Sequence, residues 1–396
     1  MGSRRSWNVE NWILLFLFLL AGMNFKAKFF YFVFAAVLVH FVLHRKICVD
    51  RSIIWYVIFT AIYAMYALKL GLMDTVRKFS FACCYLLGYN TILMTRGQGA
   101  LRHDEQERWL EACIGSVSIG SWIHLMLNFL LTRGAIVTRN TIDIWSGRVM
   151  SATGQAALAV LMLANGIVWF FLPRGNMMRW IGAGAVASIL LYNLILSGRT
   201  LIVLAALLLF VTILFILASR QFSARQRYDT VKLLIVLLVC LAVIFAFDVG
   251  GIRSKLLESN LAERFEDVEA TEDLLKDGRM ENKMKYLQSV LKYPFGGLNM
   301  RSEYGYAHDL LLDAYDECGI MMFMSLLGIM VGALADAWRT LKNTYVTARV
   351  KCLIICIYVA FLVEFSMEPI LAGMPWLFAC FALISGCIRG MVCTYE

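Results

Sequence analysis

Apolar runs long enough to cross a lipid bilayer recur along the whole length of this 396-residue chain. A transmembrane helix needs about 20 predominantly apolar residues. Hydrophobic residues make up 60% of the sequence, against about 45–50% in an ordinary globular protein. Because only helices satisfy the backbone of such segments in lipid, the sequence predicts an all-α, polytopic membrane protein. Twelve spans are expected, centred near Leu17, Ala35, Thr60, Leu87, Ser121, Leu163, Ser188, Leu207, Cys240, Met322, Tyr358 and Phe381.

The first run, Trp12–Met23, is short and resembles the core of a signal peptide. No convincing small-residue cleavage site follows it, so it is expected to be a retained helix. The chain has no internal repeat and no linker rich in Pro, Gly or Ser, which predicts a single integral membrane domain over residues 1–396. The eleven cysteines include no C-x-x-C pair, so a zinc or redox site is not expected. No cofactor and no other metal is expected either.

The distribution of Lys and Arg indicates the orientation in the membrane. With the N-terminus in the cytoplasm, the predicted inner segments hold nineteen of these residues and the short outer loops hold eight. The eight are Lys26, Lys28, Arg77, Lys78, Arg133, Arg139, Arg148 and Arg199. This bias follows the positive-inside rule, and the even number of spans returns the C-terminus to the cytoplasm. The net charge of +9 is therefore mainly a topology signal and does not indicate a nucleic-acid partner.

The same topology gathers the polar segments on the extracytoplasmic side. Arg148, Arg199, the loop 250–307 and the turn Glu364–Gly373 all fall there. A loop of about sixty residues is too long to be a passive connector. Its first half, Glu258–Glu269, is acidic and predicts a surface helix.

The second half of this loop predicts an amphipathic helix over Arg279–Lys292, lying along the bilayer surface. Its apolar residues recur three or four positions apart, and its lysines fall on the other side. The apolar residues are Met280, Met284, Leu287 and Leu291, and the lysines are Lys283, Lys285 and Lys292.

Two arginines on this side are candidates for binding an anion. Arg199 lies in the turn Ser197–Thr200, where a new helix begins with free backbone N–H groups. A guanidinium forks onto phosphate oxygens, which suits a phosphorylated substrate. The alternative for Arg199 is an interfacial arginine that reaches to lipid headgroups, and the alternative for Arg279 is a solvated loop charge.

His308 is the candidate catalytic residue. It is expected to start a helix on the outer face, with Asp309, Asp313 and Asp316 along one side of that helix at three-to-four spacing. Histidine titrates near neutral pH and commonly serves as a general base. Favourable placement in the first turn of a helix explains Asp309, but it explains Asp316 and Glu317 poorly because they lie about 10 Å further along.

These features resemble the O-antigen ligase and O-antigen polymerase family of bacterial envelope glycosyltransferases. The resemblance rests on the Ser-Gly-Arg-Thr turn at Arg199, on Arg279 followed by a helix and Pro294–Gly297, and on His308 with Gly319 downstream. The hydropathy profile and the late outer loop agree with it. The sequence departs from the family in having Asp309 where Asn or Ser is commoner.

The resemblance implies an inverting, metal-independent glycosyltransferase of the bacterial cytoplasmic (inner) membrane, with its active site on the extracytoplasmic side. The donor would be an oligosaccharide on undecaprenyl pyrophosphate, and the acceptor a sugar hydroxyl. His308 would be the base, and Arg199 with Arg279 would hold the pyrophosphate. A hydrophobic groove between helices would take the polyprenyl tail. Supporting roles are expected for Arg148, Arg301, Asp309, Asp313 and Glu364.

Three functions remain open. A polymerase of O-antigen, capsule or another surface polysaccharide is favoured, with a chain-length regulator as a further expected partner. A ligase would use the same chemistry but transfer the glycan to lipid A core. A transporter or flippase is the alternative of another class, because twelve helices is also a common transporter count. Against it, the four prolines lie at helix ends or in loops and the ionisable residues collect on one face, with Glu364 as the main exception.

Overall fold

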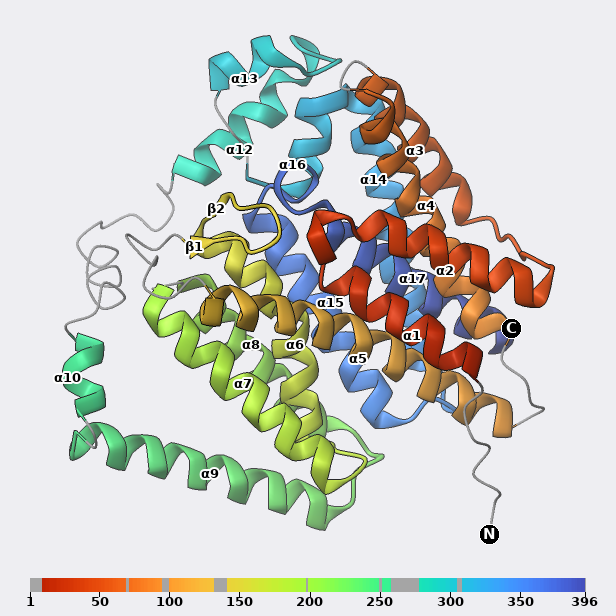
Figure 1. The fold of residues 1–396 in the computed structure, drawn as a ribbon. Coiled ribbons are helices and arrows are strands. Elements are labelled where there is room, and N and C mark those ends of the chain that lie inside the picture. Colours follow the sequence, from red (N-terminus) through yellow and green to blue (C-terminus); the bar gives the residue numbers. More distant parts are fainter. Residues whose placement is uncertain are drawn as a thin grey trace. The chain divides into compact units, whose positions relative to one another are not determined.

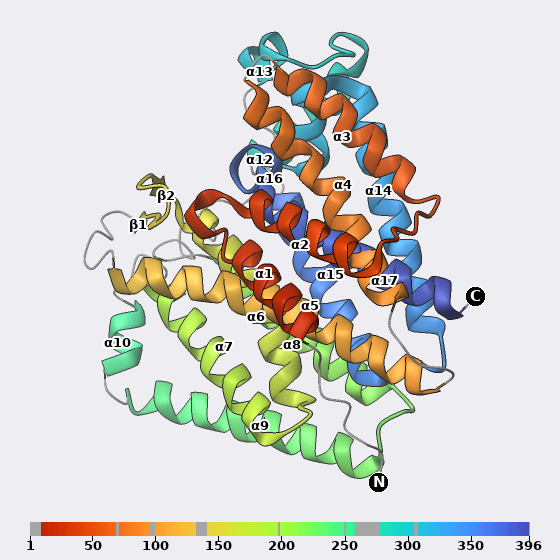
Figure 2. The same ribbon diagram turned by 45° about the vertical axis from the view of Figure 1, so that its right-hand side comes forward.

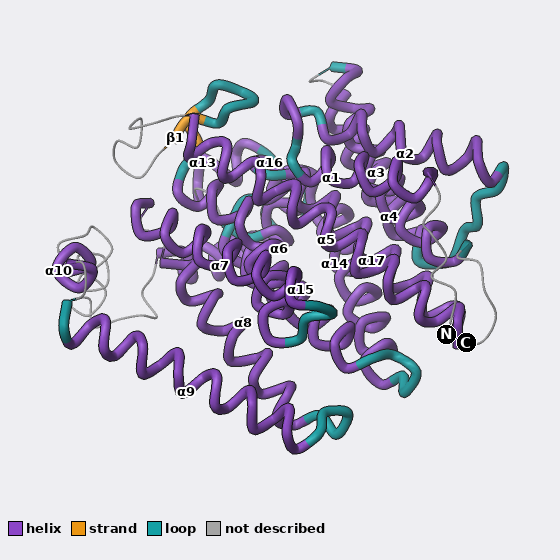
Figure 3. The backbone as a smooth tube through the Cα atoms, turned by 60° about the horizontal axis from the view of Figure 1, so that its bottom comes forward, coloured by secondary structure: helices purple, strands orange, loops and turns teal. Residues whose placement is uncertain are grey.

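The computed structural model describes residues 9–68, 71–94, 100–131, 141–196, 199–248, 251–257, 278–304 and 308–395 (Figure 1). These residues are helical almost throughout, and the sheet among them has two strands of two residues each (Figure 3). The acidic segment Glu258–Glu269, for which a surface helix was predicted, lies outside the described residues. The backbone groups into two compact units, which divide within α5 (Ala100–Leu131), after His124, and within α15 (Ala348–Met367), after Val363.

Seven helical segments in the described part of the chain are long and apolar enough to cross a membrane. They are His103–Leu131, Ala152–Phe171, Thr200–Ala218, Ala224–Ala246, Leu310–Lys342, Ala348–Met367 and Pro375–Thr394. Three shorter apolar segments, Asn11–Gly22, Phe29–His44 and Ile53–Ala67, accompany them. The chain is therefore an all-α membrane protein, as predicted, while the count of twelve spans stays a prediction.

The first unit combines residues 1–124, 278–346 and 364–396. Besides parts of α5 and α15, it contains α1 (Val9–Gly22), α2 (Phe29–His44), α3 (Ile53–Ala67), α4 (Leu72–Leu93), α12 (Gly278–Gln288), α13 (Leu298–Tyr304), α14 (Leu310–Lys342), α16 (Ile370–Gly373) and α17 (Pro375–Tyr395). Short 3-10 turns, Phe25–Ala27 and Ser289–Leu291, follow α1 and α12. The helix expected over Arg279–Lys292 is present as α12 and the turn after it.

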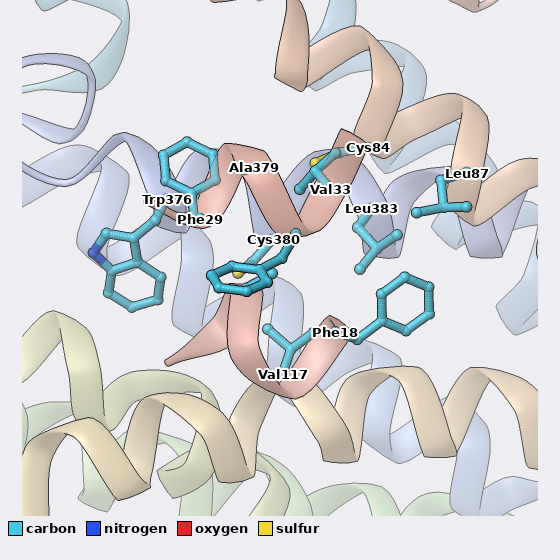
Figure 4. A pocket seen from close by; sticks show the side chains of 12 residues that line it. Phe18, Phe29, Val33, Cys84, Leu87, Val117, Trp376, Ala379, Cys380 and Leu383 are labelled. Atoms are coloured by element: carbon cyan, nitrogen blue, oxygen red, sulfur yellow. The ribbon is translucent and has the colours of Figure 1, made fainter. Parts of the chain in front are cut away.

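An aromatic cluster forms the core of the first unit where α3, α4 and α17 meet. Phe59, Phe81 and Phe378 are fully buried, and their ring centroids lie 5.2 to 6.2 Å apart. An apolar cavity of about 20 Å³ lies nearby, with Phe18 and Cys380 in its wall (Figure 4). A cavity of this size holds one water at most, and its apolar lining offers that water no hydrogen bond.

The first unit has two ends with different chemistry. We call one the loop end, where α12 and α13 lie over the C-terminus of α3 and the N-terminus of α14 (Figures 1 and 2). At this end the Tyr63 hydroxyl donates to the Leu371 carbonyl at 3.3 Å. At the opposite end Arg389 pairs with Asp50 at 2.9 Å and with Asp336 at 3.1 Å. Connections that the Lys and Arg bias assigns to the same side of the membrane therefore lie at the same end of the first unit.

A labelling experiment tests which end faces the outside. Cysteine placed at Lys285, exposed on α12, should react with an impermeant reagent in intact cells, on a cysteine-free background. Cysteine at Gln221, an exposed residue in a predicted cytoplasmic connection, should react only after the cells are opened. The reverse pattern would invert the orientation and place the candidate site in the cytoplasm.

The second unit combines residues 125–277 and 347–363. It contains α6 (Ala152–Phe171), α7 (Asn176–Leu196), α8 (Arg199–Ala218), α9 (Ala224–Ala246), α10 (Ile252–Leu257) and the strands β1 (Thr141–Ile142) and β2 (Val149–Met150). The strands pair antiparallel, with Thr141 opposite Met150. Ser151 caps α6 through the Gly154 amide, and Ser223 with Gln226 forms a capping box on α9, so local sequence fixes both helix starts.

Candidate functional site

Asp309 forms the N-cap of α14 and so sets the position of His308. One oxygen of its carboxylate accepts hydrogen bonds from the amides of Leu311 and Leu312, at 3.0 and 3.3 Å. His308, immediately before it, is half-buried and has a left-handed backbone with φ 49°. This conformation is uncommon for a residue with a side chain. The first-turn placement expected for Asp309 is therefore confirmed, and it holds His308 in a tight bend at the loop end.

Lys283 ties three elements together beside His308. Its ammonium group lies 3.1 Å from the second carboxylate oxygen of Asp309 and donates to the Ser366 carbonyl at 2.5 Å. The Lys283 and Asp309 side chains are each less than one-fifth exposed. Lys283 therefore joins α12 to the start of α14 and to the last turn of α15. Both carboxylate oxygens of Asp309 therefore make structural contacts, Oδ1 with the α14 amides and Oδ2 with Lys283.

Replacement of Lys283 by Met should loosen α12 from α14. Loss of the charge-assisted contacts is expected to destabilise this docking by about 1.5–3 kcal/mol. Hydrogen exchange over residues 278–291 would measure the change. Lys285→Met, which alters an exposed lysine on the same helix, is the matched control. Equal protection in the two variants would show that Lys283 does not hold the helix.

A break in α14 at Gly319 is filled by the segment Pro294–Gly297. Gly319 has φ 77° and ψ −169°, outside the helical region. The Gly297 amide donates to the Asp316 carbonyl at 2.7 Å, and the Ile320 amide donates to the Pro294 carbonyl at 2.9 Å. The segment thus satisfies backbone groups that the break would leave without hydrogen bonds.

The packing at this junction leaves no room for a side chain at Gly296 or at Gly319. A Cβ on Gly319 would lie 2.5 Å from the Cα of Phe295, and a Cβ on Gly296 would collide with the carbonyl oxygen of Tyr315. Both glycines also have positive φ, 77° and 61°. The Pro-Phe-Gly-Gly segment and Gly319 each contributed to the family resemblance. The structure adds that they pack against each other.

A small core holds α12, α13 and α14 together. Tyr286, Met300, Leu312 and Tyr315 are buried against one another. The Tyr315 hydroxyl donates to the Tyr293 carbonyl at 2.6 Å. On the exposed side, Lys292 lies 2.7 Å from Glu303, and hydrogen bonds from Lys292 and Tyr293 lower the pKa of Glu303 to about 2. The loop end is therefore an ordered scaffold around His308.

The remaining acidic candidates are buried. Asp313 and Asp316 are 2% and 3% exposed, on the face of α14 that packs into the first unit. Glu364 is 1% exposed in α15, and Glu368 lies one turn further on at 4%. Within the described residues no group of three His, Cys, Asp or Glu side chains is arranged to hold a metal ion.

For three of the four candidate arginines the structure describes the backbone position but not the side chain. Arg279 lies in the first turn of α12 and Arg301 in α13, both at the loop end, but their side chains lie outside the described part of the structure. Arg199 begins α8 in the second unit, and its side chain is likewise outside that part. Arg148 is exposed in the connection between β1 and β2. The described geometry therefore brings His308, Asp309 and Lys283 together and leaves the arginine contacts as predictions.

Lys78 was not singled out from the sequence, although it belongs to the loop end. It was expected in a short outer loop, whereas it lies within α4 and is 5% exposed. Its ammonium group lies 3.7 Å from the centroid of the Tyr63 ring, and Glu317 is a charged neighbour. The sequence signal that could have identified Lys78 is a lysine two turns inside an apolar helix. Lysine is seldom fully buried unless it is paired.

The arrangement provides His308 at a capped helix start, with Lys283 on the cap beside it and the backbones of Arg279 and Arg301 at the same end. Such a site can accept a proton from a hydroxyl group and attract an anionic leaving group. No protein-family model matches the chain, and a search of curated proteins finds no match to it.

Proposed function

We propose that the chain is a membrane glycosyltransferase that moves an oligosaccharide from undecaprenyl pyrophosphate to an acceptor sugar hydroxyl. The proposed setting is the outer face of a bacterial cytoplasmic membrane, and the proposed product is an extended surface polysaccharide. The observation that carries the proposal is the placement of His308. Its backbone is fixed by the Asp309 cap, and the cap is fixed by Lys283. A catalytic base benefits from such support, because misplacement by about 1 Å costs rate.

In the proposed reaction His308 removes the proton from the acceptor hydroxyl. The oxygen then attacks the anomeric carbon of the donor, and the bond from that carbon to the pyrophosphate oxygen breaks. The electron pair leaves with undecaprenyl pyrophosphate, and direct displacement inverts the anomeric configuration. Arg199 and Arg279 are proposed to stabilise the developing negative charge of the leaving group, so the mechanism uses no divalent metal.

Replacement of Arg199 or Arg279 by Lys should lower glycan transfer even though the charge is kept. A lysine is a point charge and loses the bidentate geometry of the guanidinium. Loss of one such contact typically costs about 10²–10³ in rate. The length and amount of surface glycan in a complemented deletion strain would measure it.

Arg253→Lys is the matched control, because this arginine is exposed on α10 and has no proposed role. If both Arg199→Lys and Arg199→Ala make glycan of wild-type length and amount, Arg199 has no role in the mechanism and serves only as an anchor to lipid headgroups.

Two alternatives use the same scaffold differently. A ligase would share the donor and His308, and would differ in taking lipid A core as the acceptor. A transporter is favoured by one observation, the burial of Glu364 and Glu368 near the end of α15, because intramembrane carboxyl groups often mark translocation routes. Formation of a glycosidic bond separates both transferases from the transporter.

A further inference from the structure

A cavity of about 170 Å³, lined by both polar and apolar residues, lies in the first unit, between the start of α3 and the second half of α14. Its polar lining comes from Arg51, Ser52, Tyr56, Tyr85, Asp336 and Ser385. The cavity is more than ten times the volume of about 10–15 Å³ that one water needs. It lies at the end opposite the loop end and takes no part in the proposed transfer.

Arg51 lines the cavity, and its positive charge is not neutralised by any described side chain. Its side chain is exposed, and among the described residues it makes no hydrogen bond or ion pair. The neighbouring backbone begins the fifteen-residue helix α3, and the Ser52 amide there donates to Oδ2 of Asp50 at 3.2 Å. The guanidinium itself is suited to phosphate oxygens, because its N–H groups donate to them in a bidentate fork.

Asp336, deeper in the cavity, has one oxygen available. Its Oδ1 receives hydrogen bonds from Arg389 at 3.1 Å and from Arg339 at 3.3 Å. Its Oδ2 accepts none from the part of the chain that the structure describes. A carboxylate oxygen in a buried position is stabilised by a hydrogen-bond donor, and a charged donor is stronger than a neutral one. The inner part of the cavity therefore suits an ammonium group.

The surface around the cavity is apolar. Trp55, which lines the mouth, is 45% exposed, and Ile58 on α3 and Val331 on α14 are 39% and 58% exposed. Trp338, near the end of α14, is 60% exposed. Exposed tryptophan is typical of the level where lipid headgroups meet hydrocarbon. A molecule with a polar head in the cavity and apolar chains along α3 and α14 would match both surfaces.

We propose that this cavity binds the headgroup of a phospholipid that carries a phosphate and a primary ammonium group, as in phosphatidylethanolamine. The phosphate lies on the guanidinium of Arg51, and the ammonium group donates to Oδ2 of Asp336. The acyl chains follow the exposed apolar side chains of α3 and α14. By the Lys and Arg bias this lipid belongs to the cytoplasmic leaflet.

Native mass spectrometry of the full-length protein in detergent tests the proposal. Phosphatidylethanolamine should bind about tenfold or more tightly than phosphatidylcholine with the same chains, because a trimethylammonium group cannot donate to Asp336. Gly332→Leu should reduce phosphatidylethanolamine binding by a similar factor, since Gly332 lines the cavity and has open space at its Cβ position. Arg51→Gln, an exposed change that leaves the core intact, should also reduce it.

Lys46→Gln is the matched control, because this exposed cation lies on the same connection and does not line the cavity. It should bind phosphatidylethanolamine as the wild type does. Equal binding of the two lipids, or unchanged binding in both cavity variants, would overturn the proposal. Displacement of the lipid by inorganic phosphate or soluble phosphoethanolamine at equal concentration would assign the cavity to a free small anion and would also overturn it.

Discussion

His308→Ala should lower glycan transfer by about 10²–10⁴-fold, the usual contribution of a positioned general base. The expected loss is catalytic, because the imidazole lies outside the N-cap hydrogen bonds, which come from Asp309. The variant should insert into the membrane and fold as the wild type does. The measurement is the rate of transfer by purified protein from a lipid-linked oligosaccharide to an acceptor, with EDTA present.

His103→Ala is the control for this result. His103 is a half-buried histidine of α5 whose ring stacks on Tyr345, and it has no proposed role in transfer. Its replacement should leave the rate near the wild-type value. Full activity in His308→Ala would remove the base from the mechanism. Loss of wild-type activity in EDTA would instead require a metal ion.

Gly296→Ala and Gly319→Ala should each separate the Pro294–Gly297 segment from α14. A residue with a Cβ pays about 1–3 kcal/mol in such a backbone conformation, and the steric collision adds about 1–3 kcal/mol. Gly319 is the more severe case, because its φ of 77° and ψ of −169° are adopted essentially by glycine alone. Transfer should fall sharply although His308 is unchanged, because the segment that supports α14 beneath it is displaced.

Hydrogen exchange over residues 278–304 measures this separation directly. Gly332→Ala is the matched control, since Gly332 lies on the same helix and a Cβ there meets open space. The control should keep the protection of the wild type, whereas the two junction variants lose it. Unchanged protection and activity in both junction variants would contradict the assigned role of the break.

The local parts of this site could be predicted from the sequence. Asp309 before an apolar run is a helix start, and the structure makes it the N-cap. The helix over Arg279–Lys292 was predicted from its periodicity and is present as α12. Both features depend on neighbouring residues, which is the range over which sequence patterns are informative.

The long-range parts could not be predicted. Periodicity identifies an apolar stripe but does not say whether protein or lipid covers it. The structure buries Tyr286 of α12 and leaves Met284, Leu287 and Leu291 exposed at 50%, 50% and 95%. The insertion of Pro294–Gly297 into α14 and the burial of Lys78 likewise depend on which helices become neighbours. The spacing of residues along the chain does not specify which helices become neighbours.

The most direct test of the central claim is reconstitution of the wild-type protein in liposomes with a polyprenyl-pyrophosphate-linked oligosaccharide and an acceptor glycan. The proposed function predicts a new glycosidic bond of inverted anomeric configuration and one released polyprenyl pyrophosphate for each bond, with EDTA present. Movement of the lipid-linked substrate across the bilayer with no new glycosidic bond would contradict it and identify a transporter.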